Sequence, residues 1–394
     1  MRNLLVGCNP KSDSLKRSEV YVFMRTLFQR KLFLLVVTVG FAVATSAAWA
    51  GGSKETSTAM ASGTSGGKIS ILETGSTLLY PLFNIWVPDY TGSRPNVQIT
   101  TQGTGSGTGI AMASNGTAQI GASDAYMSDA LLAQHPGVLN IPLAISAQQI
   151  NYNLPGLNDK HLRLSGPVLA GIYSGKITNW DDAAIAALNP GVTFPNKAII
   201  PVHRTDGSGD TFIFTQYLSD STPAWNSSVG SGVSVSWPAV QGGIGAEGNP
   251  GMVQALQQNP YAIAYVGVSW LDQTNKAGLG EAKIENKDGN FLMPTPETIG
   301  AAAQAGFKGT PADERISLIF EPGANSYPII NYEYALVATK QPSAAMANAL
   351  KAFLTWALDP NGGESASYLD KVHFQPLPAS IIKLSQTQID KIGS

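Results

Sequence analysis

The sequence predicts an α/β protein whose mixed, mostly parallel sheets are flanked by helices. Strand-like and helical segments alternate along the chain, and loops rich in Gly, Ser and Thr follow several of the strand-like segments. Apolar residues make up 43% of the 394 residues, which is enough for a large core. At about 150 residues per domain, this length predicts two domains.

The individual elements follow from hydrophobic periodicity and from the turn residues that bound them. Strands are predicted at residues 69–72, 97–101, 118–122 and 198–203. Helices are predicted to follow them: one that ends near residue 86, one that begins at residue 110 and one over 211–218. This alternation of strand and helix predicts parallel pairing within the sheets.

The first fifty residues have the pattern of a secretory signal peptide. An apolar run at 32–44 follows Arg30 and Lys31, and Ala48-Trp49-Ala50 forms a cleavage site of the A-x-A type. The run is shorter than the ~20 residues of a membrane span, so a membrane anchor is the weaker alternative. We expect export and cleavage after Ala50, with Met24 as an alternative start, and no lipidation because no Cys follows the apolar run.

Charged residues are scarce, at 13% of the chain compared with about 25% in ordinary soluble domains. Residues 1–50 hold seven basic and two acidic side chains, so the chain after Ala50 carries 18 basic and 25 acidic ones, a net charge of −7. Such a chain has no basic surplus for nucleic acid, which we do not expect as a partner. Any anion site must be built from local donors rather than from a basic surface.

The domain organisation is predicted from composition and from two strand-like segments. Residues 51–67 are dominated by Gly, Ser, Thr and Ala, which predicts a flexible linker. The segments Gln148–Pro155 and Tyr327–Ala335 lie at domain-sized intervals and are interpreted as hinges. Domain I would then comprise 68–149 and 327–394, and domain II 150–326. The alternative is that both segments are ordinary core strands.

Three loops share one design, in which a strand end is followed by Gly, Ser or Thr and then by a helix start. They are Thr74–Thr77, Gly103–Gly109 and Asp206–Thr211. A helix start carries free N–H donors and a partial positive charge, Gly lets the backbone approach a ligand, and hydroxyls add neutral donors. The combination predicts an anion site. The alternative is that Ser76, Ser106 and Ser208 are plain helix N-caps.

Two charged residues at strand ends complete this prediction. Arg204 presents a planar fork that suits a phosphate-like oxyanion, and we expect Asp206 to orient it; the alternative is an isolated pair of Arg204 with Asp206. Asp124 follows the strand at 118–122, where a carboxylate would repel an anion that carries no proton. Hydrogen phosphate can donate a hydrogen bond to it, whereas sulfate at neutral pH cannot. Asp124 would therefore select against sulfate.

A secreted phosphatase-like enzyme is the alternative from another functional class. The His residues at 135, 161, 203 and 373 show no metal-ligand spacing, and neither a G-x-S-x-G elbow nor a Walker A loop occurs in the sequence. The segment Asp206–Asp210 lacks the later Gly and Glu of a calcium loop. We therefore expect no enzyme activity, no metal and no cofactor. A binder of another protonated oxyanion, such as arsenate, stays open.

Several segments resemble those of the periplasmic phosphate-binding proteins of phosphate-specific ABC transporters. The resemblance is carried by GSTLLYPLFNIW (75–86), QGTGSGTGI (102–110), IGASDAYMSD (120–129), ITNWDDAAIAALNPG (177–191), HRTDGSGDTFIFTQYLS (203–219), AYVGVSWLDQ (264–273) and YPIINYEYA (327–335). It implies a type II-like, two-domain periplasmic-binding-protein fold with a ligand cleft between the domains. It also implies a periplasmic receptor that binds inorganic phosphate and delivers it to the membrane permease subunits of an importer. We expect the receptor to be a monomer.

The resemblance assigns site residues by position. It implies phosphate contacts from Ser76, Thr77, the backbone N–H of Leu78, Ser106, Asp124, Arg204, Ser208 and Gly209, with Asp206 behind Arg204. Many members have Thr where this chain has Asp210, which we also place in the site. Asp210 has two interpretations: an acidic residue that complements a helix dipole, or a second proton acceptor at the phosphate.

Overall fold

The structure is a computed structural model that describes residues 67–394, which belong to one compact unit. The predicted signal peptide at 1–50 and the predicted linker up to residue 66 lie outside the described residues. Among the described helices, none is both long enough and apolar enough to cross a membrane.

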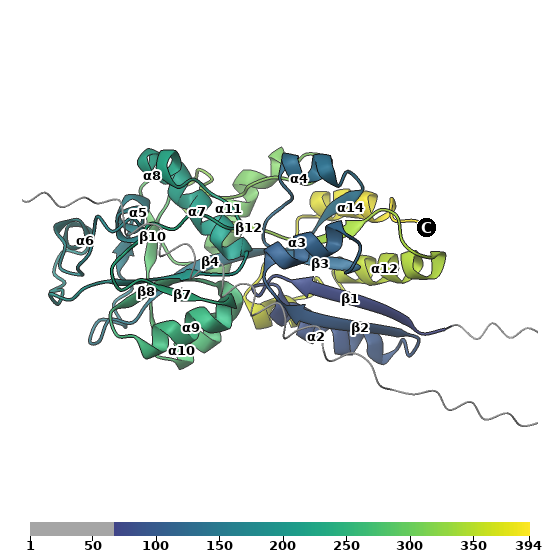
Figure 1. Ribbon diagram of the computed structural model, residues 1–394, viewed down its shortest axis with the longest axis horizontal. Helices are drawn as coiled ribbons and strands as arrows, with labels where there is room; N and C mark the ends of the chain where they lie inside the picture. Colours follow the sequence, from purple (N-terminus) through teal and green to yellow (C-terminus); the bar gives the residue numbers. More distant parts are fainter. Residues whose placement is uncertain (1–66) are drawn as a thin grey trace, which may run out of the picture. The chain divides into compact units, whose positions relative to one another are not determined.

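Most strands of the described chain join one mixed sheet (Figure 1). Its members are β1 (Ile69–Gly75), β2 (Val97–Gly103), β3 (Ile120–Ser123), β4 (Val138–Tyr152), β6 (Ile200–Arg204), β7 (Ile244–Ala246), β8 (Ala262–Gly267), β9 (Gly280–Glu281) and β12 (Ile330–Ala338). Their order is β2-β1-β3-β12-β4-β8-β6-β7, and β9 also pairs with β4. Three short strands form a separate sheet: β5 (Arg163–Leu164), β10 (Lys283–Glu285) and β11 (Phe291–Leu292).

The long strand β4 connects two groups of strands. Its residues Val138–Ala147 pair with β12, and its residues Gln148–Tyr152 pair with β8. We call β2, β1, β3 and β12 the first strand group, and β8, β6 and β7 the second strand group. Every residue of β4 is buried, as expected for a central strand that is covered on both faces.

Each strand group contains parallel pairs. β1 is parallel to β2 and β3, and β6 is parallel to β7 and β8. β12 runs antiparallel to both of its neighbours, β3 and β4. Because parallel strands end at the same edge of a sheet, Gly75, Gly103 and Ser123 lie near one another at the edge of the first group.

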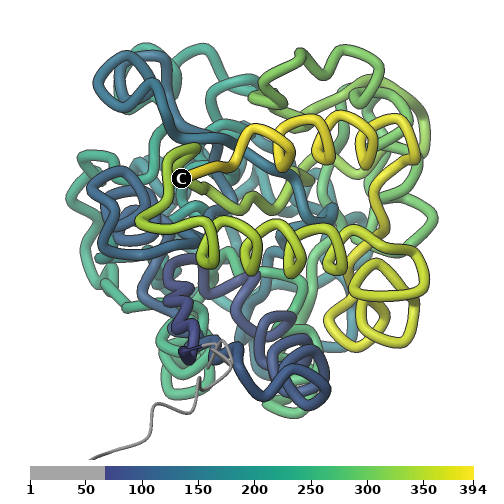
Figure 2. The backbone as a smooth tube through the Cα atoms, turned by 90° about the vertical axis from the view of Figure 1, so that its right-hand side faces the viewer, coloured from purple at the N-terminus to yellow at the C-terminus, as the bar shows by residue number. Residues whose placement is uncertain are grey.

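Helices cover both strand groups. Their bounds are α2 (Tyr80–Gly92), α3 (Ser106–Ser114), α4 (Asp129–Gln134), α5 (Gly166–Tyr173), α6 (Ala183–Leu188), α7 (Gly209–Ser221), α8 (Pro223–Ser228), α9 (Gly248–Gln258), α10 (Leu271–Lys276), α11 (Pro296–Gly306), α12 (Ala344–Ala357), α13 (Ala366–Leu369) and α14 (Ala379–Ile389). Single 3₁₀ turns occur at Val268–Trp270, Phe307–Gly309 and Asp370–Val372. α2, α3 and α12 pack on the first group, whereas α7 and α9 pack on the second. Figure 2 shows α12 and α14 side by side across the first group.

The two helices nearest the predicted site begin earlier than the sequence predicts. α3 begins at Ser106 rather than at residue 110, and α7 begins at Gly209 rather than at residue 211. Their first turns contain Gly residues, which disfavour a helix by propensity alone. Close packing requires Gly at one of these positions, because a Cβ atom on Gly109 would lie 2.8 Å from the carbonyl oxygen of Thr74. The helix forms there despite the low helix propensity of Gly. The Gly and Ser loops are thus parts of the helix starts.

The two segments predicted as hinges lie side by side where β4 changes its partner. The Gln148 N–H donates to the Ile329 carbonyl at 2.9 Å, and the Tyr327 hydroxyl donates to the Gln148 carbonyl at 2.7 Å. The division into domains at 149/150 and 326/327 stays a prediction.

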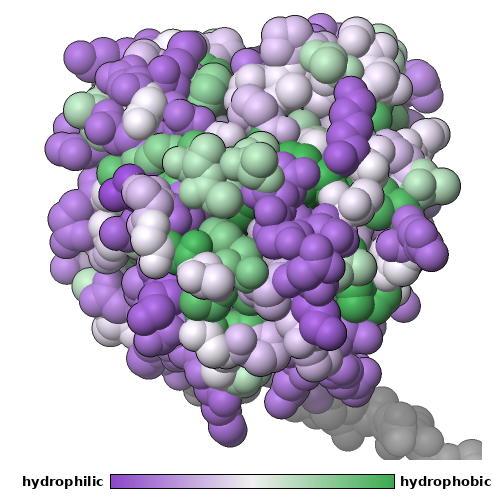
Figure 3. All heavy atoms as spheres, turned by 90° about the vertical axis from the view of Figure 1, so that its left-hand side faces the viewer, coloured by the Kyte–Doolittle hydropathy of each residue, from purple (hydrophilic) through white to green (hydrophobic). Residues whose placement is uncertain are grey.

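The face of the molecule around α5, α6 and α8 is shown in Figure 3. Pale, weakly polar residues and apolar patches alternate there with strongly hydrophilic residues.

Candidate functional site

The three Gly, Ser and Thr loops predicted from the sequence come together where the two strand groups meet. The loops after β1 and β2 belong to the first group, and the loop after β6 belongs to the second. The first turns of α3 and α7 approach each other, and the Gly107 N–H donates to the Gly207 carbonyl at 2.8 Å. The site is therefore assembled from segments that are about a hundred residues apart in the sequence.

Asp124 is the central acidic residue on the side of the first group. It directly follows β3, and only 1% of it is exposed. The Ser76 hydroxyl donates to its Oδ1, and the Ser106 hydroxyl donates to its Oδ2 at 3.3 Å. Burial raises the pKa of Asp124, although these hydrogen bonds, one with Glu333 and the charge of Arg204 oppose the rise.

The serine hydroxyls also bind the backbone. Ser76 Oγ accepts hydrogen bonds from the N–H groups of Leu78 at 3.0 Å and Leu79 at 2.9 Å, and Ser106 Oγ accepts from the Asp124 N–H at 3.2 Å. Ser208 is the N-cap of α7, as the alternative interpretation expects. The N-cap interpretation is wrong for Ser76 and Ser106, because the N-caps of α2 and α3 are Leu79 and Gly105, and both serine hydroxyls donate to Asp124 instead.

Arg204 is the cation of the site and lies at the end of β6. Its Nε donates to Asp206 Oδ1 at 2.7 Å, its Nη2 donates to Asp206 Oδ2, and its Nη1 donates to Asp210 Oδ2 at 2.6 Å. Burial opposes the positive charge, but the two carboxylates outweigh it and raise the pKa of Arg204. The same pairing outweighs burial at Asp206 and lowers the pKa of that carboxyl. Three of the five guanidinium N–H groups are thus engaged by carboxylates.

Asp210 lies in the first turn of α7 and is fully enclosed. Besides Arg204, Asn249 Nδ2 donates to its Oδ2 at 2.8 Å, and Gln148 Nε2 donates to its Oδ1 at 3.2 Å. Burial and the charge of Asp124 raise the pKa of Asp210 to about 7, against the opposing charge of Arg204. Its place in a first turn suits the helix-dipole interpretation, and its proximity to Asp124 suits the proton-acceptor interpretation.

Asn249 is a site residue that the sequence reasoning missed. It lies in the first turn of α9, and its backbone N–H and Nδ2 both donate to Thr77 Oγ1, at 3.1 and 3.0 Å. Its Oδ1 accepts from the Gly267 N–H at 2.8 Å. Asn249 therefore connects Thr77 in the first group with Asp210 in the second. The only signal was an Asn before Pro at a helix start, which is common in loops.

Two further buried polar residues of the site lie inside strands. Gln148 in β4 contacts Asp210, and Glu333 in β12 lies opposite Asp124, because Tyr334 pairs with Ser123 in antiparallel strands. Neither residue is exposed to solvent. Both stand in the segments that the sequence predicts as hinges, where a polar residue among apolar neighbours was the available signal.

Glycines allow the two sides to approach closely. A Cβ atom on Gly107 would lie 2.9 Å from the Cα atom of Gly207. A Cβ atom on Gly209 would lie 2.6 Å from Ser106 Oγ. No larger residue fits at these positions without moving the backbone or a buried side chain.

The arrangement is chemically suited to holding an oxyanion. It combines neutral hydroxyls, one arginine and one carboxylate that can accept a hydrogen bond from a ligand hydroxyl. The ring of His203 in β6 stacks on Trp237, at 5.0 Å between centroids. Within residues 67–394, no group of three His, Cys, Asp or Glu residues is arranged to hold a metal ion.

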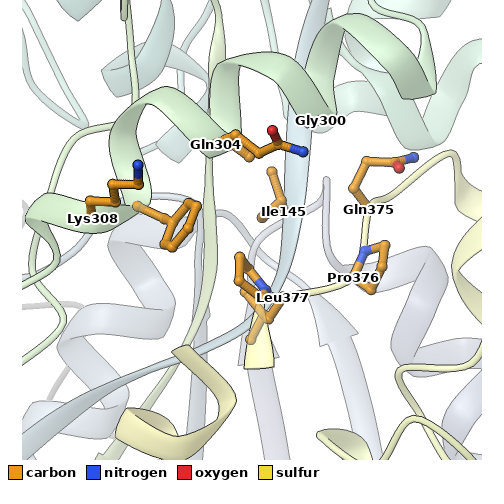
Figure 4. Close-up of a pocket in the computed structure, with 10 residues that line it drawn as sticks. Ile145, Gly300, Gln304, Lys308, Gln375, Pro376 and Leu377 are labelled. Carbon is orange, nitrogen blue, oxygen red and sulfur yellow. The ribbon is translucent and has the colours of Figure 1, made fainter. Parts of the chain in front are cut away.

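A pocket of about 550 Å³ lies elsewhere (Figure 4). Gln304 and Lys308 line one side, Gln375 and Leu377 line the other, and Ile145 of β4 lies between them. Ile145 lines this pocket, whereas Gln148, three residues further along β4, contacts Asp210. Because successive residues of a strand face opposite ways, the pocket and the contact with Asp210 lie on opposite faces of β4. None of the predicted site residues lines the pocket.

Comparison with known proteins places the chain in a family. Residues 50–361 match the family model described as the PBP superfamily domain. The phosphate-binding protein PstS of Methanocaldococcus jannaschii is 36% identical over 344 residues, which cover 82% of this chain and 86% of that protein. The phosphate-binding protein PstS of Pasteurella multocida is 37% identical over 319 residues, which cover 81% of this chain and 89% of that protein.

Solved structures share the fold. The phosphate-binding protein from Stenotrophomonas maltophilia matches with a TM-score of 0.62 at 19% identity, over 81% of this chain and 93% of that chain. PfluDING, a high-affinity periplasmic phosphate-binding protein bound with phosphate, matches with a TM-score of 0.65 at 20% identity, over 83% of this chain and 99% of that chain. The chain therefore has the two-domain fold of periplasmic binding proteins and belongs to the PstS family of phosphate-binding proteins.

Proposed function

We propose that the protein binds inorganic phosphate in the periplasm and delivers it to the membrane permease subunits of an ABC importer. The observation that carries this proposal is the meeting of Asp124 and Arg204 with hydroxyl donors at one buried place between the strand groups. The relatives from Methanocaldococcus jannaschii and Pasteurella multocida, at 36% and 37% identity, are both named as phosphate-binding proteins.

Each side of the site supplies a different part of the recognition. The two guanidinium N–H groups of Arg204 that bind no carboxylate would donate to phosphate oxygens. Ser76, Ser106 and the first N–H groups of α3 and α7 would donate further hydrogen bonds. Asp124 would accept the hydrogen bond of the phosphate hydroxyl. Binding thus exchanges hydrogen bonds among these residues for hydrogen bonds to phosphate.

The remaining predicted residues would support this arrangement. Thr77 and Leu78 belong to the loop that leads into α2, and Gly209 leaves space beside Asp124 and Ser106. Asp206 would hold the Arg204 fork in place, and Ser208 would fix the start of α7. We assign Asp210 to holding Arg204 and Asn249 rather than to direct contact with phosphate, because its carboxylate oxygens accept hydrogen bonds from these two residues and from Gln148.

Phosphate would hold the two strand groups together. Besides the contact of Gly107 with Gly207, the Ser269 hydroxyl donates to the Leu78 carbonyl at 2.7 Å, and Trp270 Nε1 donates to the Thr77 carbonyl at 2.9 Å. We infer that domain I (68–149 and 327–394) and domain II (150–326) open and close about β4 and the segment before β12. Hinge closure around a ligand is a common motion of binding proteins.

We further propose that the protein is an exported monomer and that it catalyses no reaction on the phosphate it binds. The relatives compared above are named as phosphate-binding proteins, which supports binding without a reaction on phosphate. The signal-peptide pattern at 1–50 supports export.

Calorimetric titration of the purified protein with phosphate, sulfate and arsenate tests this function. Phosphate should bind with a measurable heat and raise the melting temperature. Sulfate should bind at least about a hundredfold more weakly, because an unprotonated oxyanion would leave Asp124 unpaired and repelled. Arsenate carries the same protons as phosphate, so the difference between the two affinities measures how far the site selects its ligand by size alone. Absence of both heat and thermal shift with phosphate would refute the proposal.

A further inference from the structure

Glu333 is a buried acid directly behind the predicted phosphate contact. It lies in β12 with none of its surface exposed, and β12 pairs with both β3 and β4. The Ser146 hydroxyl of β4 donates to Glu333 Oε1, while Oε2 receives no hydrogen bond from the described residues. Asp124 directly follows Ser123, which pairs with Tyr334, the residue after Glu333, and Asn331 Nδ2 of the same strand donates to the Asp124 carbonyl at 2.9 Å. β12 therefore places Glu333 beside Asp124.

The backbone directs Glu333 to this position. The register of β12 with β4 shifts directly after Glu333, so that Ala144 pairs with Glu333 and Pro142 pairs with Tyr334. Such irregularities re-aim side chains, and Pro is tolerated in a sheet where a ladder hydrogen bond is already missing. The irregularity is therefore a feature that orients the strand beside the site.

The charges around the site do not balance without a proton. Four carboxyl groups face one cation: Asp124 after β3, Asp206 and Asp210 beside α7, and Glu333 in β12, against Arg204 at the end of β6. Arg204 forms ion pairs with Asp206 and Asp210. Asp124 and Glu333 form none among the described residues; Ser106 of α3 donates to Asp124, and Ser146 of β4 donates to Glu333. Two further charges act on them from the second strand group, that of Arg204 on Asp124 and that of Asp210 on Glu333. Two adjacent buried carboxylates without a cation would repel each other strongly.

We propose that Glu333 is a positioning residue that keeps a proton on Oε2 and donates a hydrogen bond through this proton to Asp124. Asp124 thereby stays an ionised acceptor for the phosphate hydroxyl. The inference rests on the proposed function and adds a residue to it. The proton remains on Glu333 during binding, and no covalent bond forms or breaks. Without ligand, Asp124 is then held by three donors, Ser76, Ser106 and Glu333. When the two serine hydroxyls turn to phosphate, Glu333 remains the donor that holds Asp124 beside the ligand hydroxyl.

The directions in which the pKa values of Glu333 and Asp124 are shifted agree with a proton on Glu333. Burial raises the pKa of Glu333 well above its ordinary value, and the charge of Asp124 raises it further. The hydrogen bond from Glu333 lowers the pKa of Asp124 in turn. The shared proton therefore belongs on Glu333. When alkaline pH removes it, a second negative charge appears behind the site, and phosphate affinity falls.

The test compares Glu333→Gln, Glu333→Leu and wild type, with Glu314→Gln as the control. Gln can donate a hydrogen bond but cannot ionise, whereas Leu can do neither. Glu314 is another glutamate with none of its surface exposed, and it is hydrogen-bonded to Ser385 rather than to a site residue. Phosphate affinity is measured by calorimetry from pH 6 to pH 10, together with the melting temperature of each variant.

We expect Glu333→Gln to bind phosphate at least about tenfold more tightly than Glu333→Leu at pH 7, because a hydrogen bond to a charged group is worth about that much. The alkaline loss of affinity should be weaker in Glu333→Gln than in wild type, since phosphate itself titrates identically in both. Glu314→Gln should follow the wild-type profile. The infrared C=O band of a protonated acid at pH 7 should decrease in Glu333→Gln.

Three results would overturn the proposal. Equal binding by the Gln and Leu variants would deny the donor role, and tighter binding by Glu333→Gln than by wild type at pH 7 would indicate an ionised Glu333. If the infrared band of protonated acids is unchanged in Glu333→Gln, Glu333 carries no proton at pH 7. This conclusion does not depend on whether Glu333→Leu folds. If wild type itself bound no phosphate, the proposed function would fail, whereas the infrared result would still report the proton on Glu333.

Discussion

The two sides of the site hold their charges in different ways. On the side of the second strand group, Arg204 neutralises Asp206 and Asp210 through ion pairs. On the side of the first group, Asp124 is held by serine hydroxyls, and the buried Glu73 of β1 is held by Thr101. Neither of these two carboxyls forms an ion pair within residues 67–394. The second side thus depends on ion pairs, and the first depends on protons and neutral donors.

This difference divides the work of binding an anion. The second side supplies attraction, because its arginine keeps two N–H groups for the ligand. The first side supplies selectivity, because a buried carboxylate tolerates only an anion that brings a proton. A site of this kind can bind phosphate in a chain of net negative charge without a basic surface.

Arg204→Met should have the largest effect, because it removes the attraction and leaves Asp206 and Asp210 without their cation. We expect phosphate affinity to fall by about a hundredfold or more, together with a lower melting temperature, since breaking a buried pair costs about 3–5 kcal/mol. Calorimetry and thermal unfolding measure the two effects. Arg315→Met is the control, because Arg315 also pairs with two carboxylates, Asp129 and Asp313. A similar loss of affinity in both variants would contradict a local role of Arg204.

Asp124→Asn tests the selectivity of the first side. An amide can donate a hydrogen bond to an unprotonated oxyanion, so sulfate should bind more tightly and the ratio of phosphate to sulfate affinity should fall roughly tenfold or more. Titration of the variant with both anions measures the ratio. If the ratio stays at the wild-type value, Asp124 does not read the ligand proton.

Sequence reasoning identified the loops on both sides but not the single buried polar residues that connect them. The loops with Ser76, Ser106 and Asp206–Thr211 were accessible because strand end, Gly or Ser, and helix start recur in one order, and the resemblance added Thr77 and Gly209. Asn249, Gln148 and Glu333 were not assigned, since each is a single polar residue whose partner lies far away in the sequence. Which residues meet across the strand groups depends on the partner change in β4, and no local pattern encodes it.

Gly107→Ala tests the close contact between the two sides. The added Cβ would meet backbone rather than a flexible side chain, at 2.9 Å from the Gly207 Cα atom, so the two loops must separate by a few tenths of an ångström. We expect phosphate affinity to fall about tenfold, since small displacements weaken several hydrogen bonds together. Gly300→Ala in α11 is the matched control, because nothing lies within 4 Å of its added Cβ. Undiminished affinity in Gly107→Ala would show that closure does not need this contact.

The smallest effect is expected on the pH dependence of stability, where Glu73 of the first side and Asp206 of the second side should differ in sign. Burial raises the pKa of Glu73 to about 8, so the folded state holds a proton that the unfolded state releases above pH 4.5, and stability falls as the pH rises from about 4.5 to 8. The pKa of Asp206 is lowered by Arg204, so its contribution is present above its unfolded pKa and is lost on acidification. Glu73→Gln should therefore flatten the slope above pH 4.5 and stabilise the protein by about 1–3 kcal/mol at pH 8 relative to wild type. Asp206→Asn should instead flatten the acidic limb. Denaturant unfolding between pH 3 and pH 8 measures both slopes, and an unaltered slope above pH 4.5 in Glu73→Gln would mean that the first side does not rely on buried protons.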